Sequence, residues 1–451
     1  MEGGYHLSFW SLGFTIIFAL YLLLQLKYIY SSLKVKKAPY IANKEKKITV
    51  LIPAFNEELV LLQCLESWQR LTYDNKEAIF INDGSTDNTM NVLHELLDLS
   101  VVEKEKTLDN SSRNFSRLFQ SKDFPQIYVI DQQNSGKSAA LNAGISVATG
   151  EIVITLDADS ILESDSLTRI NESFSDRKVI AAGGMVQVGQ MINRRGNTLY
   201  RKNWIIKYQL SGYLSSFYVR KVTQAKLNVL GVVSGAFGAF RLSILQQIGG
   251  FKDTLGEDME ITFRLQKFLH ERKLGEKMIF VPEAVCYTEV PEDFKSLLHQ
   301  RIRWQKGFLD CINLYKKDFF TKLSKKFSFF LLFESIVLST ISITALIILP
   351  FSIYLGTISP LTILLICTAW SSEFVLRMVA VQRAGHFGYT FSTKQWLKIV
   401  FFTIWESVTY RLLDTFFFVY GSILYIFGSR QKWQKLQRSG SVIYTEMEPV
   451  K

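Results

Sequence analysis

The sequence predicts an α/β domain with a parallel-rich sheet, inserted between transmembrane helices. Short, nearly continuous apolar runs alternate with amphipathic stretches between Lys46 and about Tyr315, which is typical of a parallel sheet covered by helices on both faces. Apolar tracts long enough to cross a bilayer flank that region. We therefore divide the 451 residues into an N-terminal helix with a basic linker (1–45), the α/β domain (46–315), C-terminal transmembrane and interfacial helices (316–428) and a basic tail (429–451).

The first element is a transmembrane helix. No charged residue occurs from Leu7 to Leu26, a stretch of about 20 residues that matches the hydrocarbon thickness of a bilayer. A cleaved signal peptide carries its positive charge before the apolar run, whereas here Glu2 precedes the run and Lys27 and Lys34 follow it. We therefore expect a retained helix with its N-terminus outside and the following domain in the cytoplasm.

The strands and helices of the α/β domain follow in order. Apolar strands are expected within 47–57 (KITVLIPAFNE), 78–87 (AIFINDGSTD), 126–131 (QIYVID) and 151–160 (EIVITLDADS), and helices at 58–70, 89–97 and 137–148. Residues 99–125 are polar and without a clear period, which indicates a surface insertion. Ligands of such sheets bind at the carboxyl ends of the strands, so the residues there are the candidate site.

Polar clusters follow three of these strands, namely Asn56-Glu57, Asp83-Gly84-Ser85 and Asp157-Ala158-Asp159. Two carboxylates that stand two residues apart at a strand end can project to one side. Carboxylates together with phosphate oxygens are the usual ligands of Mg²⁺ or Mn²⁺. Each cluster alone is a weak signal, because the same residue types are good turn formers.

Residues 134–138 (NSGKS) suggest part of a phosphate-binding loop. Asp131 stands where a P-loop needs its first glycine, so an NTPase is not predicted. Lys137 opens a helix, where it either approaches an anionic ligand or is an ordinary solvated lysine, and the sequence favours neither interpretation.

A further helix is expected at GEDMEITFRL (256–265), and it begins with two acidic residues. Glu257 and Asp258 are either partners of the helix dipole or include a general base at the lip of a pocket. The two side chains cannot point the same way, so at most one of them is the base.

In HQRIRWQKG (299–307), Gln300, Arg303 and Trp304 share one face of a helix. A juxtamembrane amphipathic helix explains the arginine and the tryptophan, but a glutamine on that face gains nothing from lipid. An aromatic ring beside a guanidinium suits a sugar bound next to a phosphate.

The C-terminal third contains two further apolar regions. Residues 327–381, broken near Pro360, suit two spans joined by a turn. Residues 396–427 contain Glu406, Arg411 and Asp414, which suggests one span plus an interfacial helix, because ionisable groups are costly in lipid. Three plain spans place the basic tail outside, whereas the positive-inside rule places it in the cytoplasm, and this topology stays open.

The formal net charge of +11 lies largely beside the spans, so we expect lipid headgroups rather than nucleic acid as its partners. The four cysteines form no CxxC pair, which fits a reduced cytosolic domain without a zinc site.

The ordered set PAFNE, DGSTD, DADS, SGAFGAFR, GEDMEIT and QRIRW, between flanking spans, resembles the processive family 2 glycosyltransferases. These are the membrane synthases of cellulose, chitin, hyaluronan and poly-N-acetylglucosamine. The run from VVSGAFGAFRLSIL to GGFKDTLGEDMEITFRLQ is most similar to bacterial poly-β-1,6-N-acetylglucosamine synthases. The resemblance covers about Lys46 to Lys306 and implies a GT-A type nucleotide-sugar-binding domain that inverts the anomeric carbon.

The resemblance also implies roles for single residues. Glu57, Asp83 and Asp157 would lie at the nucleotide, together with Lys137, and Asp159 would bind the metal. Asp258 would be the general base with Glu257 as its neighbour. From the QxxRW motif, Gln300 and Arg303 would serve the acceptor and the leaving UDP, and Trp304 would stack under the acceptor sugar.

The implied ligands are a UDP-sugar donor, Mg²⁺ or Mn²⁺, and a growing polysaccharide or lipid acceptor, in a multi-pass protein of the plasma membrane. A small membrane partner subunit is compatible with this scheme. Residues 197–221 mix cations with aromatics and would form an interfacial helix. Alternative hypotheses are a hyaluronan-type synthase, a non-processive transferase that makes a glycolipid, and a transporter or scaffold that is not an enzyme.

Overall fold

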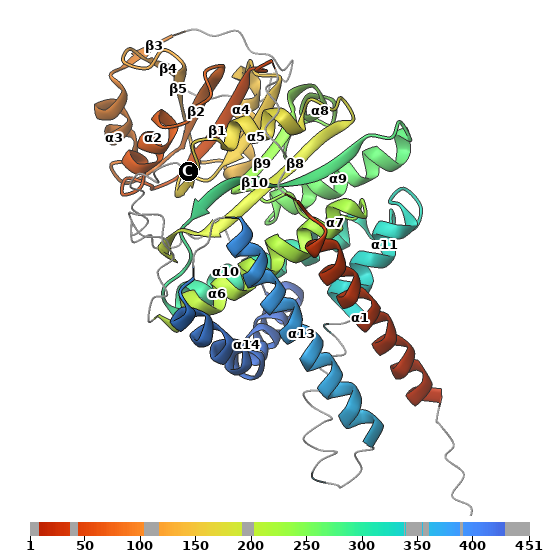
Figure 1. The fold of residues 1–451 in the computed structure, drawn as a ribbon. Coiled ribbons are helices and arrows are strands. Elements are labelled where there is room, and N and C mark those ends of the chain that lie inside the picture. The colour runs from red at the N-terminus through yellow and green to blue at the C-terminus, as the bar shows by residue number, and fades with distance from the viewer. Residues whose placement is uncertain are drawn as a thin grey trace, which may run out of the picture.

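The structure is a computed structural model, and it describes residues 9–36, 44–102, 117–191, 203–337, 339, 354, 360–387 and 391–428. The basic tail at 429–451 and the turn expected before Pro360 lie outside the described residues. Figure 1 shows a sheet domain with a group of long helices on one side of it, so that α1 (Phe9–Leu33) and α13 (Pro360–His386) project away from the sheet.

One mixed sheet forms the centre of the domain, with the strand order β3-β4-β5-β2-β1-β6-β9-β8-β10-β7. The bounds are β1 Ile48–Ala54, β2 Lys76–Asp83, β3 Leu99–Val101, β4 Arg117–Ser121, β5 Ile127–Gln132, β6 Ile152–Leu156, β7 Ser160–Leu162, β8 Val179–Val188, β9 Phe237–Arg241 and β10 Lys277–Thr288. The neighbours β5, β2, β1 and β6 run parallel, as do β8 and β10, while the remaining pairs are antiparallel. The predicted α/β class is confirmed.

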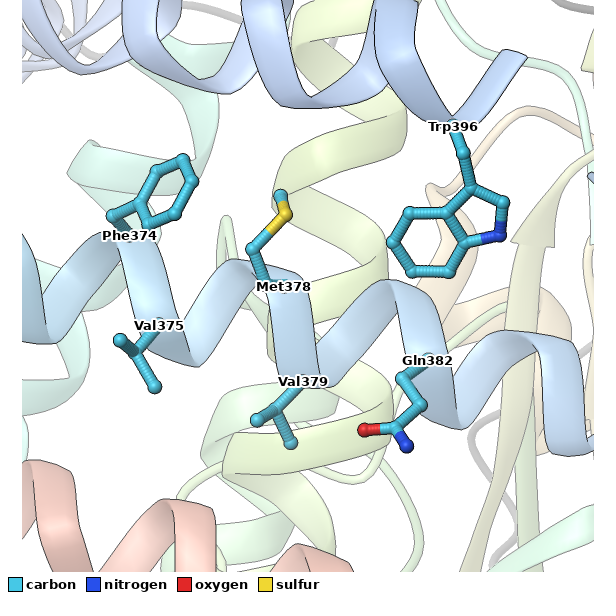
Figure 2. Close-up of a pocket in the computed structure, with 6 residues that line it drawn as sticks. All are labelled: Phe374, Val375, Met378, Val379, Gln382 and Trp396. Atoms are coloured by element: carbon cyan, nitrogen blue, oxygen red, sulfur yellow. The ribbon is translucent and has the colours of Figure 1, made fainter. Parts of the chain in front are cut away.

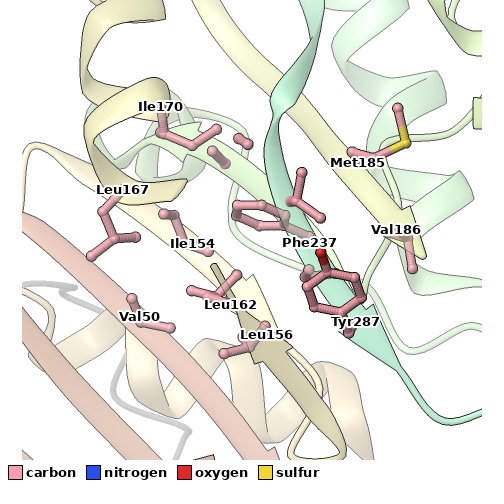
Figure 3. Close-up of a cluster of buried hydrophobic side chains, with 14 of the residues drawn as sticks. Val50, Ile154, Leu156, Leu162, Leu167, Ile170, Met185, Val186, Phe237 and Tyr287 are labelled. Carbon is pink, nitrogen blue, oxygen red and sulfur yellow. The ribbon is translucent and has the colours of Figure 1, made fainter. Parts of the chain in front are cut away.

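Both faces of the sheet are buried. Successive side chains of a strand point to opposite faces, so one strand can contribute to two apolar clusters. On β1, Val50 and Ile52 belong to one apolar cluster, whereas Leu51 between them belongs to another. Figure 3 shows part of the first cluster, where Leu167 and Ile170 gather with Val50. The helices that flank these strands are α2 Leu61–Gln69, α3 Thr89–Leu97, α4 Lys137–Val147, α5 Ser166–Ser173, α8 Leu242–Gln247 and α9 Glu257–Arg272.

The expected surface insertion at 99–125 is partly wrong. Its ends form β3 and β4, which extend the sheet by an antiparallel edge. Leu118 and Phe119 are buried there and supply the apolar contacts that the polar composition of the segment conceals. Residues 103–116 lie outside the described residues.

The remaining helices pack on one side of the sheet domain, and three helices contain stretches that could span a membrane. Their bounds are α6 Trp204–Ser215, the π-helical segment η2 Ser216–Lys221, α7 Val222–Lys226, α10 Phe294–Tyr315, α11 Lys325–Leu331, the π-helical segment η3 Leu332–Val337 and α14 Thr393–Phe427. Within the described ranges, three helical stretches are long and apolar enough to cross a membrane: Ile16–Leu33, Ile363–His386 and Thr409–Phe427. The first overlaps the expected stretch from Leu7 to Leu26.

The expectation of a span plus a separate interfacial helix at 396–427 is also corrected, since α14 is one continuous helix of 35 residues that begins with a capping box. Its Glu406 forms an ion pair with Arg377 of α13, which satisfies a charge that would otherwise be costly in lipid. In its described part, the segment 197–221 that was expected as one interfacial helix is an unbroken helical run made of α6 and η2.

Candidate active site

The loops after β1 and β2 are joined by Asn56. Its backbone has φ +58°, a left-handed conformation that asparagine tolerates better than most residues. The Asn56 Oδ1 accepts hydrogen bonds from the amides of Thr86 (2.6 Å) and Asp87 (3.3 Å), and the Asn56 amide donates to Ser85 Oγ at 2.9 Å. The next residue, Glu57, is buried. The first two predicted clusters therefore lie side by side at the carboxyl edge of the sheet.

Asp83 is buried at the end of β2, where it holds the loop before α4. Its Oδ1 accepts from Gln132 Nε2 (2.7 Å) and the amide of Ser135 (2.9 Å), and its Oδ2 accepts from the amide of Gly136 at 2.9 Å. The neighbouring Gly84 has φ +65°, and a Cβ there would lie 2.4 Å from the Asn134 nitrogen. Only glycine fits this approach, which fixes the course of the NSGKS loop.

Lys137 is the centre of the site. Its Nζ lies 2.6 Å from Asp157 Oδ1 and 3.0 Å from Glu257 Oε1, so it joins the end of β6 to the start of α9. Burial alone would lower the pKa of Lys137, but the two carboxylates outweigh it and the pKa is raised. Lys137 is therefore held by two ion pairs rather than free in solvent, and its contact with an anionic ligand stays a prediction.

Asp159 lies two residues beyond Asp157 and is buried. Its Oδ1 accepts from Ser160 Oγ (3.3 Å) and Thr288 Oγ1 (3.4 Å). Among the described residues, no group of three or more His, Cys, Asp or Glu side chains could hold a metal. The donor set still fits Mg²⁺ or Mn²⁺, because such ions are usually bound through one or two carboxylates plus substrate phosphates.

Asp258 contacts the loop before β9. Its Oδ2 accepts from the Gly235 amide (3.2 Å) and its Oδ1 from the Met259 amide (2.8 Å). Burial first, and then the charge of Glu257, raise the pKa of Asp258 above its ordinary value. The two acids therefore have different partners, and its raised pKa makes Asp258 a stronger base than an ordinary aspartate.

Helix α10 packs against the start of α9 through two glycines. A Cβ on Gly307 would lie 3.0 Å from both the Cα and the nitrogen of Gly256, which shows how closely the two backbones approach. Gly307 follows the QRIRW segment on the same helix, so this contact fixes α10 against the start of α9. The helices that carry the predicted GED and QxxRW motifs are thus packed together.

The three predicted residues of α10 differ in exposure. Gln300 is buried, and its Oε1 has no hydrogen-bond partner among the described residues. Trp304 is 40% exposed, and the guanidinium of Arg301, not of Arg303, lies over its ring at 4.3 Å. Arg303 is half-buried and forms no ion pair with any described residue, which leaves its charge available to a ligand.

Sequence reasoning missed Lys221. It belongs to η2, is buried, donates to the Val232 carbonyl at 3.0 Å and interacts electrostatically with Asp258. The RK pair at 220–221 gave no signal for this, because beside a membrane it suggests lipid headgroups. A cavity of about 410 Å³ between α13 and the start of α14 contains none of the site residues (Figure 2).

Comparisons with known proteins identify the family of this chain. The family model "Glycosyl transferase family 2" matches residues 49–249, and "Glycosyl transferase family group 2" matches residues 152–380, about half of the chain. The chain belongs to glycosyltransferase family 2. The predicted family resemblance is confirmed.

Relatives among curated proteins carry one description. Poly-beta-1,6-N-acetyl-D-glucosamine synthase of Staphylococcus aureus (strain COL) is 29% identical over 306 residues, which is 67% of this chain and 64% of the relative. The synthase of Staphylococcus epidermidis is 29% identical over 292 residues, 64% of this chain and 61% of the relative. The match thus spans less than two thirds of these relatives' length.

A solved structure with a similar fold is a mannosyltransferase from Pyrobaculum calidifontis in complex with GDP-Man and Mn²⁺. It has a TM-score of 0.53 at 16% identity and covers 92% of this chain and 95% of its own. At this identity the similarity concerns the fold, and it confirms the predicted glycosyltransferase type of domain.

Proposed function

We propose that this chain is an inverting membrane glycosyltransferase that polymerises N-acetylglucosamine from a UDP-sugar into a β-linked extracellular polysaccharide. One observation carries the proposal: Lys137 joins Asp157 at the strand end to Glu257 at the start of α9. A residue proposed to bind the nucleotide is thereby linked to the neighbour of the proposed base. The names of the relatives support the choice of sugar and polymer.

The donor nucleotide would lie along the edge formed by the loops after β1, β2 and β5. Asp83 holds that edge through three hydrogen bonds, and a carboxylate has about four acceptor positions, which leaves one on Oδ2 for the nucleotide. Glu57 and Asp157 would complete the contacts to uridine and ribose. Lys137, already paired with Asp157, would approach the diphosphate from the helix start.

Asp159 would hold Mg²⁺ or Mn²⁺ together with oxygens of the donor diphosphate, which is the arrangement that suits a site with few protein ligands. The bound ion would neutralise charge on the diphosphate. The mannosyltransferase of similar fold contains Mn²⁺ and a nucleotide sugar, which supports the same class of ligands here.

Asp258 would accept the proton of the acceptor hydroxyl while the hydroxyl oxygen forms its bond to C1 of the donor sugar. The bond from C1 to the UDP oxygen breaks on the opposite face, UDP leaves with the electron pair, and the anomeric centre inverts. The hydrogen bonds from the Gly235 and Met259 amides fix the orientation of the Asp258 carboxylate, and its raised pKa makes it a stronger base. Arg303 would balance the charge that grows on the leaving diphosphate.

Gln300 and Trp304 would bind the acceptor. The exposed Trp304 ring offers a flat face to a sugar, and the buried Gln300 Oε1 offers an acceptor for a hydroxyl. Residues 46–315 would form the cytoplasmic catalytic domain of a multi-pass plasma-membrane protein. The candidate spans support this placement, since α10 packs against α14, which contains one of them.

Product analysis tests the proposal. The full chain in lipid nanodiscs is supplied with Mg²⁺ or Mn²⁺ and a panel of UDP-sugars, and UDP release and product mass are measured. We expect release from UDP-N-acetylglucosamine together with a high-mass polymer, and the loss of both in Asp258→Asn. Asp98→Asn is the matched control, because Asp98 is exposed at the far edge of the sheet, pairs with Lys122 and has the φ of +39° that asparagine tolerates.

Each other outcome has a defined meaning. Polymer made from alternating donors would favour the hyaluronan-type alternative, and a glycolipid alone would favour the non-processive transferase. Equal UDP release by wild type and Asp258→Asn would exclude Asp258 as the base.

A further inference from the structure

The motif SGAFGAFR (234–241) begins in the loop before β9 and lies against the candidate site. A Cβ on Gly235 would lie 3.2 Å from Lys137 Nζ and 3.3 Å from Glu257 Oε1. The same Cβ would lie 3.5 Å from the Cβ of Asp258, and the Gly235 amide donates to Asp258 Oδ2 at 3.2 Å. The backbone of this loop therefore forms one side of the site and holds one oxygen of the proposed base.

Thr262 of α9 fastens the loop to the helix that carries Asp258. The Thr262 side chain is buried, and its Oγ1 accepts from the Val233 amide at 2.9 Å. The same hydroxyl donates to the Asp258 carbonyl at 2.6 Å. Val233 is buried as well, so loss of the hydroxyl would remove the hydrogen-bond partner of its amide, which is unfavourable for a buried donor.

These three hydrogen bonds close a ring. From the Asp258 carboxylate the ring passes to the Gly235 amide, back along the chain to Val233, and through the Thr262 hydroxyl to the Asp258 carbonyl. A threonine inside a helix often donates to the carbonyl four residues earlier, and this habit accounts for the last bond. It does not account for the amide that Thr262 accepts from another segment, which fixes the distance between the loop and the first turn of α9.

We propose that Thr262 is a positioning residue for Asp258: its hydroxyl holds the loop before β9 so that the Gly235 amide keeps the Asp258 carboxylate in one orientation. The inference rests on the proposed role of Asp258 as the general base. A base transfers a proton efficiently only from a defined position, so loss of the hydroxyl should slow the transfer. Donor binding should not change, because Asp83 is held by hydrogen bonds to other segments.

The test measures kcat and the donor KM of UDP release by the full chain in nanodiscs, together with thermal unfolding. Thr262→Val keeps the β-branched shape but removes the hydroxyl. We expect its kcat to fall about tenfold or more at an unchanged donor KM, since a positioned base contributes about 10²- to 10⁴-fold to a rate. Thr262→Ser keeps the hydroxyl and should retain most of the wild-type kcat.

Thr403→Val is the matched control and should keep the wild-type kcat. Thr403 is also a buried threonine inside a helix, and its Oγ1 donates to the Ile399 carbonyl, four residues earlier, at 2.8 Å. Within the part of the chain that the structure describes, however, it accepts no amide from another segment.

The outcomes separate this inference from the proposed function. A wild-type kcat in Thr262→Val beside an inactive Asp258→Asn would overturn the role of Thr262 alone. Equal losses in the Val and Ser variants, a donor KM that rises as much as kcat falls, or a Thr262→Val protein that does not fold would assign Thr262 a structural role and reject the inference. An active Asp258→Asn would overturn the proposed function itself.

Discussion

The contact between Gly256 and Gly307 gives a quantitative prediction. In Gly307→Ala, the new Cβ would lie 3.0 Å from the Cα and the nitrogen of Gly256 and 3.2 Å from the Leu255 carbonyl carbon. These are backbone atoms that cannot rotate away. Carbon atoms pack at about 3.5 to 4.0 Å, so α10 must move away from α9 by roughly 0.5 Å or more.

Two effects on stability oppose each other. Overpacking costs about 1 to 3 kcal/mol, and replacing glycine with alanine inside a helix returns about 1 kcal/mol. The net loss is therefore about 0 to 2 kcal/mol. Activity should suffer more, since a misplacement of about 1 Å can reduce the rate about 10²-fold. We expect kcat to fall by about tenfold or more because the QRIRW segment moves relative to Asp258.

The assay measures UDP release at saturating donor together with the thermal unfolding temperature in nanodiscs. Gly212→Ala is the matched control, because Gly212 also lies inside a helix but a Cβ there meets no atom within 4 Å. It should keep its activity and gain a little stability. A Gly307→Ala protein with wild-type kcat would refute the idea that the contact between Gly256 and Gly307 positions α10.

Three further predictions concern stability and pH. Glu77→Gln should destabilise the fold by about 1.5 to 3 kcal/mol, since buried Glu77 accepts hydrogen bonds from Thr49 and Thr149 and pairs with Lys47. The value of kcat should not change, because these residues lie at the edge of the sheet opposite the candidate site; thermal unfolding and kinetics measured together check this. Gly84→Ala should lower the unfolding temperature and raise the KM for the donor, because its Cβ would displace the NSGKS loop. The proposed base Asp258 acts only in its ionised form, and its pKa is raised, so kcat/KM should fall with decreasing pH at a value above that of an ordinary aspartate. A pH profile measured down to pH about 4 checks this.

Much of the fold was predictable from local patterns. The apolar strand at 48–54 and the helix that begins at Lys137 form where expected, because their periodicity depends on neighbouring residues alone. The edge strands β3 and β4 were not predictable, since their pairing depends on burial of Leu118 and Phe119 against the rest of the sheet. The continuity of α14 was also missed, because the charge of Glu406 suggested a break and its partner Arg377 lies on another helix.

The candidate site, like the fold, was predictable from the sequence only in part. The sequence by itself determined the strand-end carboxylates, the GED and QRIRW helices and their order along the chain, because these are properties of contiguous residues. Only the tertiary structure decided that Lys137 joins Asp157 to Glu257, and that Arg220 of η2 pairs with Glu334 of η3. Ion pairs of this kind join residues far apart in the chain, so they exist only after the sheet crossovers and the helix packing have brought the charges together and removed the water between them.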